Sequence, residues 1–248
     1  MYALFDRFAE RYDLHTPPDH YRHDHAFVLG VAGKSGSGCH MLDVGCGTGV
    51  LLEKAHQAGF VAKGIDASPG MVEVARFRAG RSNVTLRRMQ EIDEEAAYDL
   101  IVALSWTINY CANVEELRDV LRRLRRALRP GGRMLLQVAH AMNVDGEPLE
   151  DLESGPSGVP GDVVFGYRFE RLGPEGLKMR AEYSYACKSL GERLHEVHVL
   201  QVTDARLVAE CMRKTGLRDV ELFDSWRRDA FSRSASPFVY GVKETRGS

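Results

Sequence analysis

Three glycines and two aspartates near the start of the chain have the residue types and spacing of a ligand-binding loop. Met41–Val50 reads MLDVGCGTGV, so Gly45, Gly47 and Gly49 directly follow an apolar run. Glycines let a ligand approach the backbone closely, at the carboxyl edge of a sheet where open α/β folds bind ligands. Asp66 follows Gly45 by about 20 residues, the spacing at which a carboxylate grips ribose hydroxyls in such folds. The pattern predicts a nucleoside-containing ligand.

The glycine spacing also separates two kinds of nucleoside ligand. The dinucleotide fingerprint is G-x-G-x-x-G/A, whereas here the third glycine comes one residue early and Val50 fills the expected position. Asp43 lies two residues before the first glycine, where a carboxylate would repel a pyrophosphate but suits a cationic ligand. An NAD(P)-dependent oxidoreductase is therefore the disfavoured alternative, and titration with each cofactor separates the two.

Alternating strand and helix patterns surround this loop. Ser68 before Pro69 is typical of a helix start, and Asn113 with Glu116 three residues later predicts another. Gly59, Gly80 and Pro130-Gly131-Gly132 end the helices. Five apolar runs predict strands at 40–44, 60–65, 84–88, 100–105 and 134–139. Such alternation indicates a doubly wound, mostly parallel sheet.

The pattern changes after His140. Residues 143–161 are acidic and rich in Gly and Pro, with no period, and predict a loop or lid. Polar–apolar alternation predicts three antiparallel strands at Val163–Arg171, Leu177–Ser189 and Arg193–Val202. A helix from Thr203 or Asp204 to Lys214 and strands at Val220–Trp226 and Phe238–Val242 then return to the core. A β-rich cap is therefore expected to interrupt the α/β fold.

Four segments in this order, DVGCGTG, GIDASPGM, YDLIVALS and LRPGGRMLLQ, resemble the motifs of class I S-adenosylmethionine (SAM)-dependent methyltransferases. The likeness covers about residues 5–140 plus the last helix and strands. Residues 5–13, with Phe5-Asp6 and Tyr12-Asp13, resemble the leading helix of small-molecule members. Residues 194–207 are similar, less specifically, to aminosugar and small-amine N-methyltransferases.

The resemblance implies a seven-stranded, Rossmann-like α/β fold with an inserted antiparallel β cap. It divides the chain into an N-terminal helical lid (1–37), a SAM-binding core (38–142), a substrate cap (143–202) and a completion of the core (203–244). The implied activity is in-line methyl transfer from SAM to a small metabolite, leaving S-adenosylhomocysteine (SAH), and nitrogen is favoured over oxygen. An O-methyltransferase and a SAM-binding regulatory protein remain alternatives.

The resemblance also assigns the cofactor contacts. The glycine loop would face the methionine part, Asp43 its ammonium and Asp66 the ribose. Gln90 stands where relatives usually have Asp, and its amide oxygen would accept the adenine amino group. The full set of expected cofactor-binding residues is Tyr12, Tyr21, Asp43, Gly45, Cys46, Gly47, Gly49, Asp66, Ala67, Met71, Gln90, Glu91, Leu104 and Ser105.

The acceptor side is expected at the ends of two core strands and in the cap. His140 and Tyr110 are the candidate catalytic residues, and His140 has an equal structural alternative. Because His195 and His198 differ by an odd number on one strand, at most one of them faces the pocket. The candidate acceptor-binding residues are Trp106, Asn109, Tyr183 and His198.

Aromatic residues in the cap repeat at period two and so share a face on each strand. They are Phe165, Tyr167 and Phe169, then Tyr183 and Tyr185. Either a lid over the acceptor or a homodimer interface would use these faces.

Composition narrows the partners. The 248 residues carry 33 Lys and Arg against 35 Asp and Glu, and this balance disfavours a nucleic-acid-binding protein. No apolar run reaches the ~20 residues that cross a bilayer, and residues 1–13 do not read as a signal peptide. Five scattered cysteines fit a reducing, cytoplasmic setting. No metal is expected, although histidines cluster at His15, His20, His23 and His25.

Overall fold

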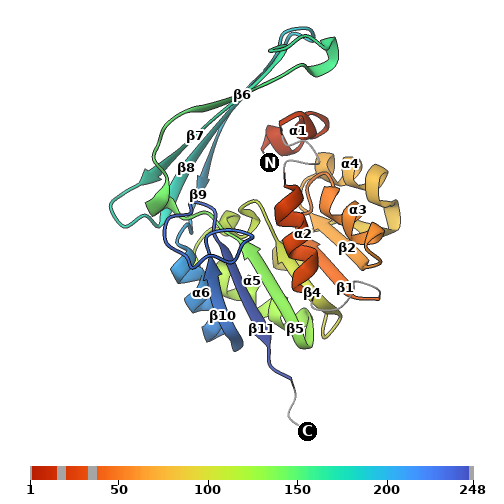
Figure 1. Ribbon diagram of the computed structural model, residues 1–248, viewed down its shortest axis with the longest axis vertical. Coiled ribbons are helices and arrows are strands. Elements are labelled where there is room, and N and C mark those ends of the chain that lie inside the picture. The colour runs from red at the N-terminus through yellow and green to blue at the C-terminus, as the bar shows by residue number, and fades with distance from the viewer. Residues whose placement is uncertain (1, 16–20, 33–37, 246–248) are drawn as a thin grey trace.

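The computed structural model describes residues 2–15, 21–32 and 38–245 (Figure 1). A seven-stranded sheet forms the core, in the order β10-β11-β5-β4-β1-β2-β3. Pairing is parallel from β5 to β3, and β11 runs antiparallel to both β5 and β10. The strands are β1 His40–Val44, β2 Val61–Asp66, β3 Val84–Leu86, β4 Tyr98–Ala103, β5 Leu128–Gln137, β10 Leu217–Phe223 and β11 Phe238–Lys243. The expected doubly wound α/β fold is confirmed.

Helices cover both faces of this sheet (Figure 1). One face packs against α2 (Arg22–Val31), α3 (Val50–Gln57) and α4 (Pro69–Ala79), and the other against α5 (Val114–Ala127) and α6 (Ala205–Lys214). On α5, the buried stripe is Leu117, Val120, Leu121 and Leu124. Burial of these apolar faces stabilises the three layers at about 25 cal/mol per Å² of apolar area.

Capping side chains start these helices where the sequence predicts. Ser68 Oγ accepts from the Met71 amide before α4, and Asn113 Oδ1 accepts from the Glu116 amide before α5. Asp204 caps α6 by accepting from the amides of Arg206 and Leu207. Such caps satisfy amides that have no partner within the helix.

A second, antiparallel sheet forms the cap, in the order β6-β7-β8-β9. Its strands are β6 Leu149–Glu153, β7 Val163–Leu172, β8 Lys178–Cys187 and β9 Glu192–Leu200. The expectation of three strands is wrong by one, because β6 lies within the segment predicted as a loop. Its sequence, LEDLE, lacks clear alternation, and the strand forms by pairing with β7 at the sheet edge.

The N-terminal segment joins core and cap. It contains the short helix η1 (Ala3–Phe5) and helix α1 (Ala9–His15), which Figure 1 shows between the cap and α4. Glu196 of β9 accepts from the amides of Ala3 and Leu4 at 2.8 and 3.0 Å. On the core side, Asp6 accepts from the Gly70 amide at 3.1 Å. A Cβ at Gly70 would lie 2.2 Å from the Asp6 carbonyl oxygen, so this contact requires glycine.

Candidate functional site

The glycine loop follows β1 and is tied to the neighbouring strand. The amides of Gly45 and Cys46 both donate to the Ile65 carbonyl, at 2.8 and 3.0 Å. Gly45 has φ +71°, and a Cβ there would lie 2.4 Å from Thr107 Oγ1. The left-handed backbone and this close approach both require glycine.

Asp66 ends β2 beside this loop. Its Oδ2 accepts from the Gly47 amide at 3.0 Å, and its Oδ1 accepts from the Ser68 amide at 2.9 Å. Burial raises the pKa of Asp66, and hydrogen bonds from the amides of Ser68, Gly47 and Ala67 partly offset the rise. The carboxylate therefore holds the loop and the start of α4 in one arrangement.

A cavity of about 500 Å³ opens between the loop, the ends of β2 and β4, and the N-terminal segment. This volume is within the range of small-molecule binding sites in proteins. Eight expected site residues line it, namely Gly45, Gly47, Asp66, Ala67, Met71, Gln90, Ser105 and Tyr110. Tyr2, Phe5, Met89 and Thr107 also line it and were not anticipated from the sequence.

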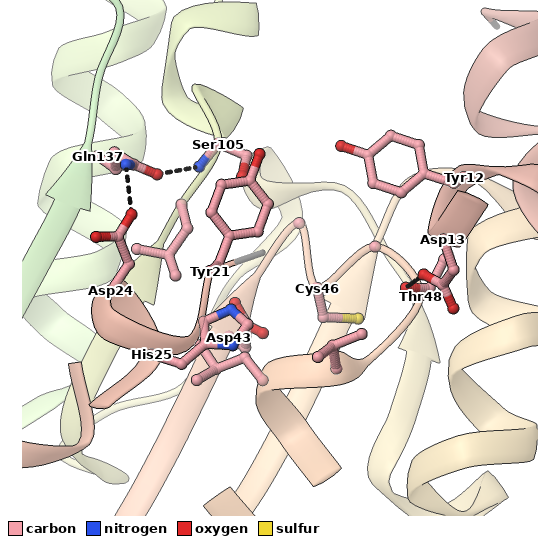
Figure 2. Close-up of a pocket in the computed structure, with 15 residues that line it drawn as sticks. Tyr12, Asp13, Tyr21, Asp24, His25, Asp43, Cys46, Thr48, Ser105 and Gln137 are labelled. Atoms are coloured by element: carbon pink, nitrogen blue, oxygen red, sulfur yellow. Dashed lines mark hydrogen bonds between the residues drawn. The ribbon is translucent and has the colours of Figure 1, made fainter. Parts of the chain in front are cut away.

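A smaller cavity of about 90 Å³ adjoins the first and shares Gly45, Gly47 and Ser105 with it (Figure 2). The expected residues Tyr12, Tyr21, Asp43, Cys46 and Leu104 line it. Three carboxylates, those of Asp13, Asp24 and Asp43, belong to its wall. Arg78 pairs with Asp13 at 2.5 Å, and the remaining acidic groups of the wall favour a cationic ligand group.

Two buried groups in the smaller cavity have perturbed protonation. Burial, with the nearby Asp66 charge, raises the pKa of Asp43 to about 7. Burial, with the Lys54 charge, lowers the pKa of His25 to about 4. Among the described residues, His25 Nδ1 is buried without a hydrogen-bond partner. Nothing in the sequence distinguishes His25 from its neighbouring histidines.

A tight turn after β4 brings Ser105 to both cavities. Ser105 and Trp106 have φ angles of +47° and +66°, which are unfavourable for residues with a Cβ. Gln137 at the end of β5 holds the turn, because its side-chain oxygen accepts from the Ser105 amide at 3.1 Å and its carbonyl from the Trp106 amide at 3.2 Å. Gln137 also donates to Asp24 at 3.3 Å (Figure 2). Strain of this kind is concentrated at functional sites in proteins.

Of three further residues expected to bind the cofactor, only Gln90 lines a cavity. Gln90 lines the larger cavity, and its amide nitrogen donates to Glu116 at 3.1 Å, which leaves its oxygen as the acceptor. Glu91 is not in the wall of either cavity; its carboxylate accepts from the Arg88 amide at 3.0 Å. Gly49 also lies outside both walls, where a Cβ would come within 3.1 Å of Ala75.

The cap brings His198 and Tyr183 to Tyr110. His198 has no exposed side-chain area, and its Nδ1 lies 2.7 Å from the Tyr110 hydroxyl. The ring centroids of Tyr183 and His198 are 4.8 Å apart. His195 lies on the other face, 62% exposed and 2.7 Å from Glu182. As expected, only one of the two histidines faces inward.

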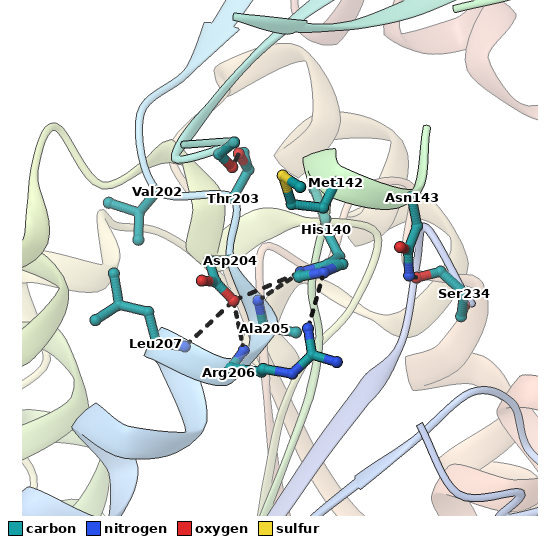
Figure 3. Close-up of polar contacts among 12 residues, drawn as sticks. His140, Met142, Asn143, Val202, Thr203, Asp204, Ala205, Arg206, Leu207 and Ser234 are labelled. Carbon is teal, nitrogen blue, oxygen red and sulfur yellow. Dashed lines mark hydrogen bonds and ion pairs between the residues drawn. The ribbon is translucent and has the colours of Figure 1, made fainter. Parts of the chain in front are cut away.

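His140 lies at a distance from this group, in neither cavity wall. Its side chain is buried, its Nδ1 accepts from the Ala205 amide at 3.2 Å, and its Nε2 lies 3.4 Å from the Arg206 guanidinium (Figure 3). Burial lowers its pKa, and Asp204 partly offsets this. The geometry favours the structural alternative, in which His140 joins the end of β5 to the start of α6.

Asn109 and Trp106 also make structural contacts outside both cavity walls. Asn109 is fully buried; its side chain donates to the Val202 carbonyl and accepts from the Ala139 amide at 2.9 Å. Trp106 Nε1 donates to Ser236 at 2.9 Å, and its ring packs edge-on against Phe169 of the cap at 4.8 Å. These contacts hold the cap against the core.

Two other expectations concern metals and membranes. His15 (its side chain) and His20 lie outside the described residues, and no group of three potential metal ligands occurs in the part of the chain described. Within the same residues, no helix has both the length and the apolar character to cross a membrane.

Part of the chain is similar in sequence to known methyltransferases. Residues 41–132, which run from β1 into β5, match a family described as a methyltransferase domain. A dTDP-4-amino-2,3,4,6-tetradeoxy-D-glucose N,N-dimethyltransferase of Saccharopolyspora spinosa is 34% identical over 92 residues, 37% of each protein. A ubiquinone biosynthesis O-methyltransferase of Xanthomonas oryzae pv. oryzae (strain PXO99A) is 31% identical over 108 residues, 41% of this chain and 44% of the relative. The chain spans about half the length of the curated relatives it matches.

Solved structures match over nearly the whole chain. The sugar N-methyltransferase KedS8 from Streptoalloteichus sp ATCC 53650 superposes with a TM-score of 0.73 at 23% identity, covering 90% of this chain and 88% of that one. At this identity the match shows the fold. Residues 41–132 thus match a methyltransferase domain, and nearly the whole chain shares the fold of a sugar N-methyltransferase.

Proposed function

We propose that this protein binds SAM and transfers its methyl group to an amino group of a small molecule. The observation that carries the proposal is the pair of adjoining cavities, which share the glycine loop and differ in charge. The larger offers Asp66 for ribose hydroxyls and an apolar wall with Met71 and Met89 for a purine. The smaller offers carboxylates for an ammonium.

Methyl transfer from a sulfonium is an in-line displacement, and SAM supplies the activated methyl group. The residues of this chain then have to position the nucleophile and exclude water. Ser105 lines both cavities, and the rings of Tyr2, Phe5 and Tyr110 line the larger one. The N-terminal segment and the cap would enclose the acceptor.

Two features favour nitrogen as the target atom. Aromatic rings attract cations through the negative face of the ring, and methylation places positive charge on an amine. Tyr2, Phe5, Tyr12, Tyr21 and Tyr110 all belong to the cavity walls. The 34% identical relative is named for N,N-dimethylation of an amino sugar, which supports the same choice.

The test is methyl transfer by the whole chain with SAM and a panel of acceptors, followed by mass spectrometry. The panel includes dTDP-4-amino-2,3,4,6-tetradeoxy-D-glucose, other primary amines and small phenols. Methylation of an amine supports the proposal. Methylation of phenols alone would make the protein an O-methyltransferase. SAM binding without turnover on any acceptor would favour a regulatory SAM-binding protein.

A further inference from the structure

Three polar side chains from the core and the cap form a continuous hydrogen-bonded chain that ends at the larger cavity. Tyr110, from the short helix η4 (Thr107–Tyr110), lines the cavity. Its hydroxyl lies 2.7 Å from His198 Nδ1, and His198 Nε2 lies 3.3 Å from Glu196 Oε2. The motifs of the core sequence do not include His198 or Glu196.

The direction of the hydrogen bonds follows from the chemistry of the groups. An ionised carboxylate can only accept, so His198 must carry its proton on Nε2 and donate to Glu196. Nδ1 then has a lone pair, and the Tyr110 hydroxyl must donate to it. The phenol oxygen keeps its own lone pairs for a donor in the cavity.

Glu196 is held in place as an acceptor. Besides His198, it accepts from the backbone amides of Ala3 and Leu4 at 2.8 and 3.0 Å. Burial would raise the pKa of Glu196, but the amides of Leu4 and Ala3, with His198, bring it below its usual value. The carboxylate is therefore ionised at neutral pH.

The imidazole is enclosed by rings and carries no charge of its own. Tyr2 stacks on it with centroids 3.5 Å apart, and Phe5 and Tyr183 contact it at 5.2 and 4.8 Å. Burial lowers the pKa of His198, and Glu196 partly offsets this. The titratable side chains in contact with the ring are Tyr2, Tyr110, Tyr183 and Glu196. Because its pKa is lowered, the ring is neutral at pH 7, and Nδ1 can accept a proton.

We propose that Tyr110 is the catalytic residue that takes the proton lost by the acceptor nitrogen, and that His198 and Glu196 are its positioning residues and the proton's destination. This inference rests on the proposed methyltransferase function. An acceptor that binds as an ammonium first passes one N–H proton to the Tyr110 oxygen while the phenol proton passes to His198 Nδ1. The neutral amine then attacks, so that the nitrogen–carbon bond forms, the carbon–sulfur bond breaks and positive charge moves from sulfur to nitrogen. The products are a methylated ammonium, a thioether and an imidazolium paired with Glu196.

The first test needs no turnover. The whole chain, labelled with ¹⁵N-histidine, is measured by NMR alone and with SAH, and His198→Gln assigns the signal. We expect His198 to be protonated on Nε2 and unprotonated on Nδ1 in both states. Protonation on Nδ1 would overturn the proposal, because Nδ1 could not then accept the phenol proton. SAH binding, followed separately by calorimetry, tests the methyltransferase function itself.

The second test compares kinetics with an amine that the wild-type chain methylates. We expect Tyr110→Phe and His198→Gln to lower kcat at pH 7 by about 10²–10⁴-fold, the range of general acid–base catalysis, with an unchanged Kd for SAH. The defect should shrink as pH rises above the pKa of the amine, because the nucleophile then needs no proton acceptor.

The outer face of β9 provides matched controls. His195 and Glu182 form a similar pair at 2.7 Å outside both cavities, so His195→Gln and Glu182→Gln should keep the wild-type kcat. A His198→Gln variant with wild-type kcat, or a loss of equal size at every pH, would overturn the proposal. If His198→Gln does not fold, Tyr110→Phe decides, because it removes one oxygen only.

Discussion

Asp66 combines two roles at the scale of a single residue. Its oxygens accept from the Gly47 and Ser68 amides, which shapes the loop, and it also lines the larger cavity. We expect Asp66→Ala to weaken SAM binding by about 1–3 kcal/mol through lost charge-assisted hydrogen bonds. Glu91→Ala is the control, because Glu91 lies outside both cavity walls and should leave the Kd unchanged. An unchanged Kd in folded Asp66→Ala would remove Asp66 from the site.

Asp43 makes ligand binding depend on pH. Burial raises its pKa to about 7, so this carboxyl group titrates near neutral pH. A cationic ligand group favours the ionised form and lowers this pKa. SAM affinity should therefore rise with pH up to about 7 and level off above it, and binding at lower pH should release protons.

Calorimetry in buffers of different ionisation enthalpy measures this proton release. Asp43→Asn cannot ionise, and it should bind SAM more weakly with no pH dependence near neutrality. An affinity for the wild-type chain that is constant between about pH 6 and 8 would contradict the proposed contact between Asp43 and the ligand's ammonium.

At the scale of elements, His140 joins β5 to α6. We expect His140→Ala to lower the free energy of unfolding by roughly 1–3 kcal/mol, because the Ala205 amide loses a buried acceptor. The Kd for SAM and the kcat per folded molecule should stay close to wild type. Chemical denaturation and steady-state kinetics measure both. A large loss of kcat with unchanged stability would return His140 to the catalytic candidates.

The cap gives a prediction about its aromatic face. On that face Tyr183 stands opposite Tyr167 and Glu196, next to His198. If the face encloses the acceptor, Tyr183→Ala should lower kcat/KM for the acceptor and leave the Kd for SAH unchanged. If the face is instead a homodimer interface, the variant should dissociate in analytical ultracentrifugation and keep its kinetics.

The core elements could be predicted from the sequence because their signals are local. Ser68, Asn113 and Asp204 cap helices as expected, and the apolar runs became parallel strands. Strand β6 could not be predicted, since its five residues have no clear pattern of their own and depend on pairing with β7. An edge strand of this kind is determined by its partner rather than by its side chains.

In the site, too, residues placed by local sequence signals could be predicted, and residues placed by distant contacts could not. Motif residues such as Gly45, Asp66 and Met71 came together in the cavity walls because the loop and strand ends fix them. His25, Gln137 and Glu196 were missed, because their roles depend on contacts with distant segments. His140 was expected at the right strand end, but its contacts with α6 decide its role, and a strand pattern does not contain them.

For the whole molecule, the site is assembled from three parts of the chain. The core supplies the glycine loop, the cap supplies His198 and Tyr183, and the N-terminal segment bonds to both through Glu196 and Gly70. The division into four domains follows these parts and remains a proposal.

The most direct measurement is a calorimetric titration of the whole chain with SAM and SAH, with NADH and NADPH as controls. A methyltransferase with this site should bind one SAM or SAH per chain and neither nicotinamide cofactor, and Asp66→Ala should weaken the binding. Failure of the folded wild-type chain to bind SAM or SAH, or binding of a nicotinamide cofactor in their place, would contradict the proposed function.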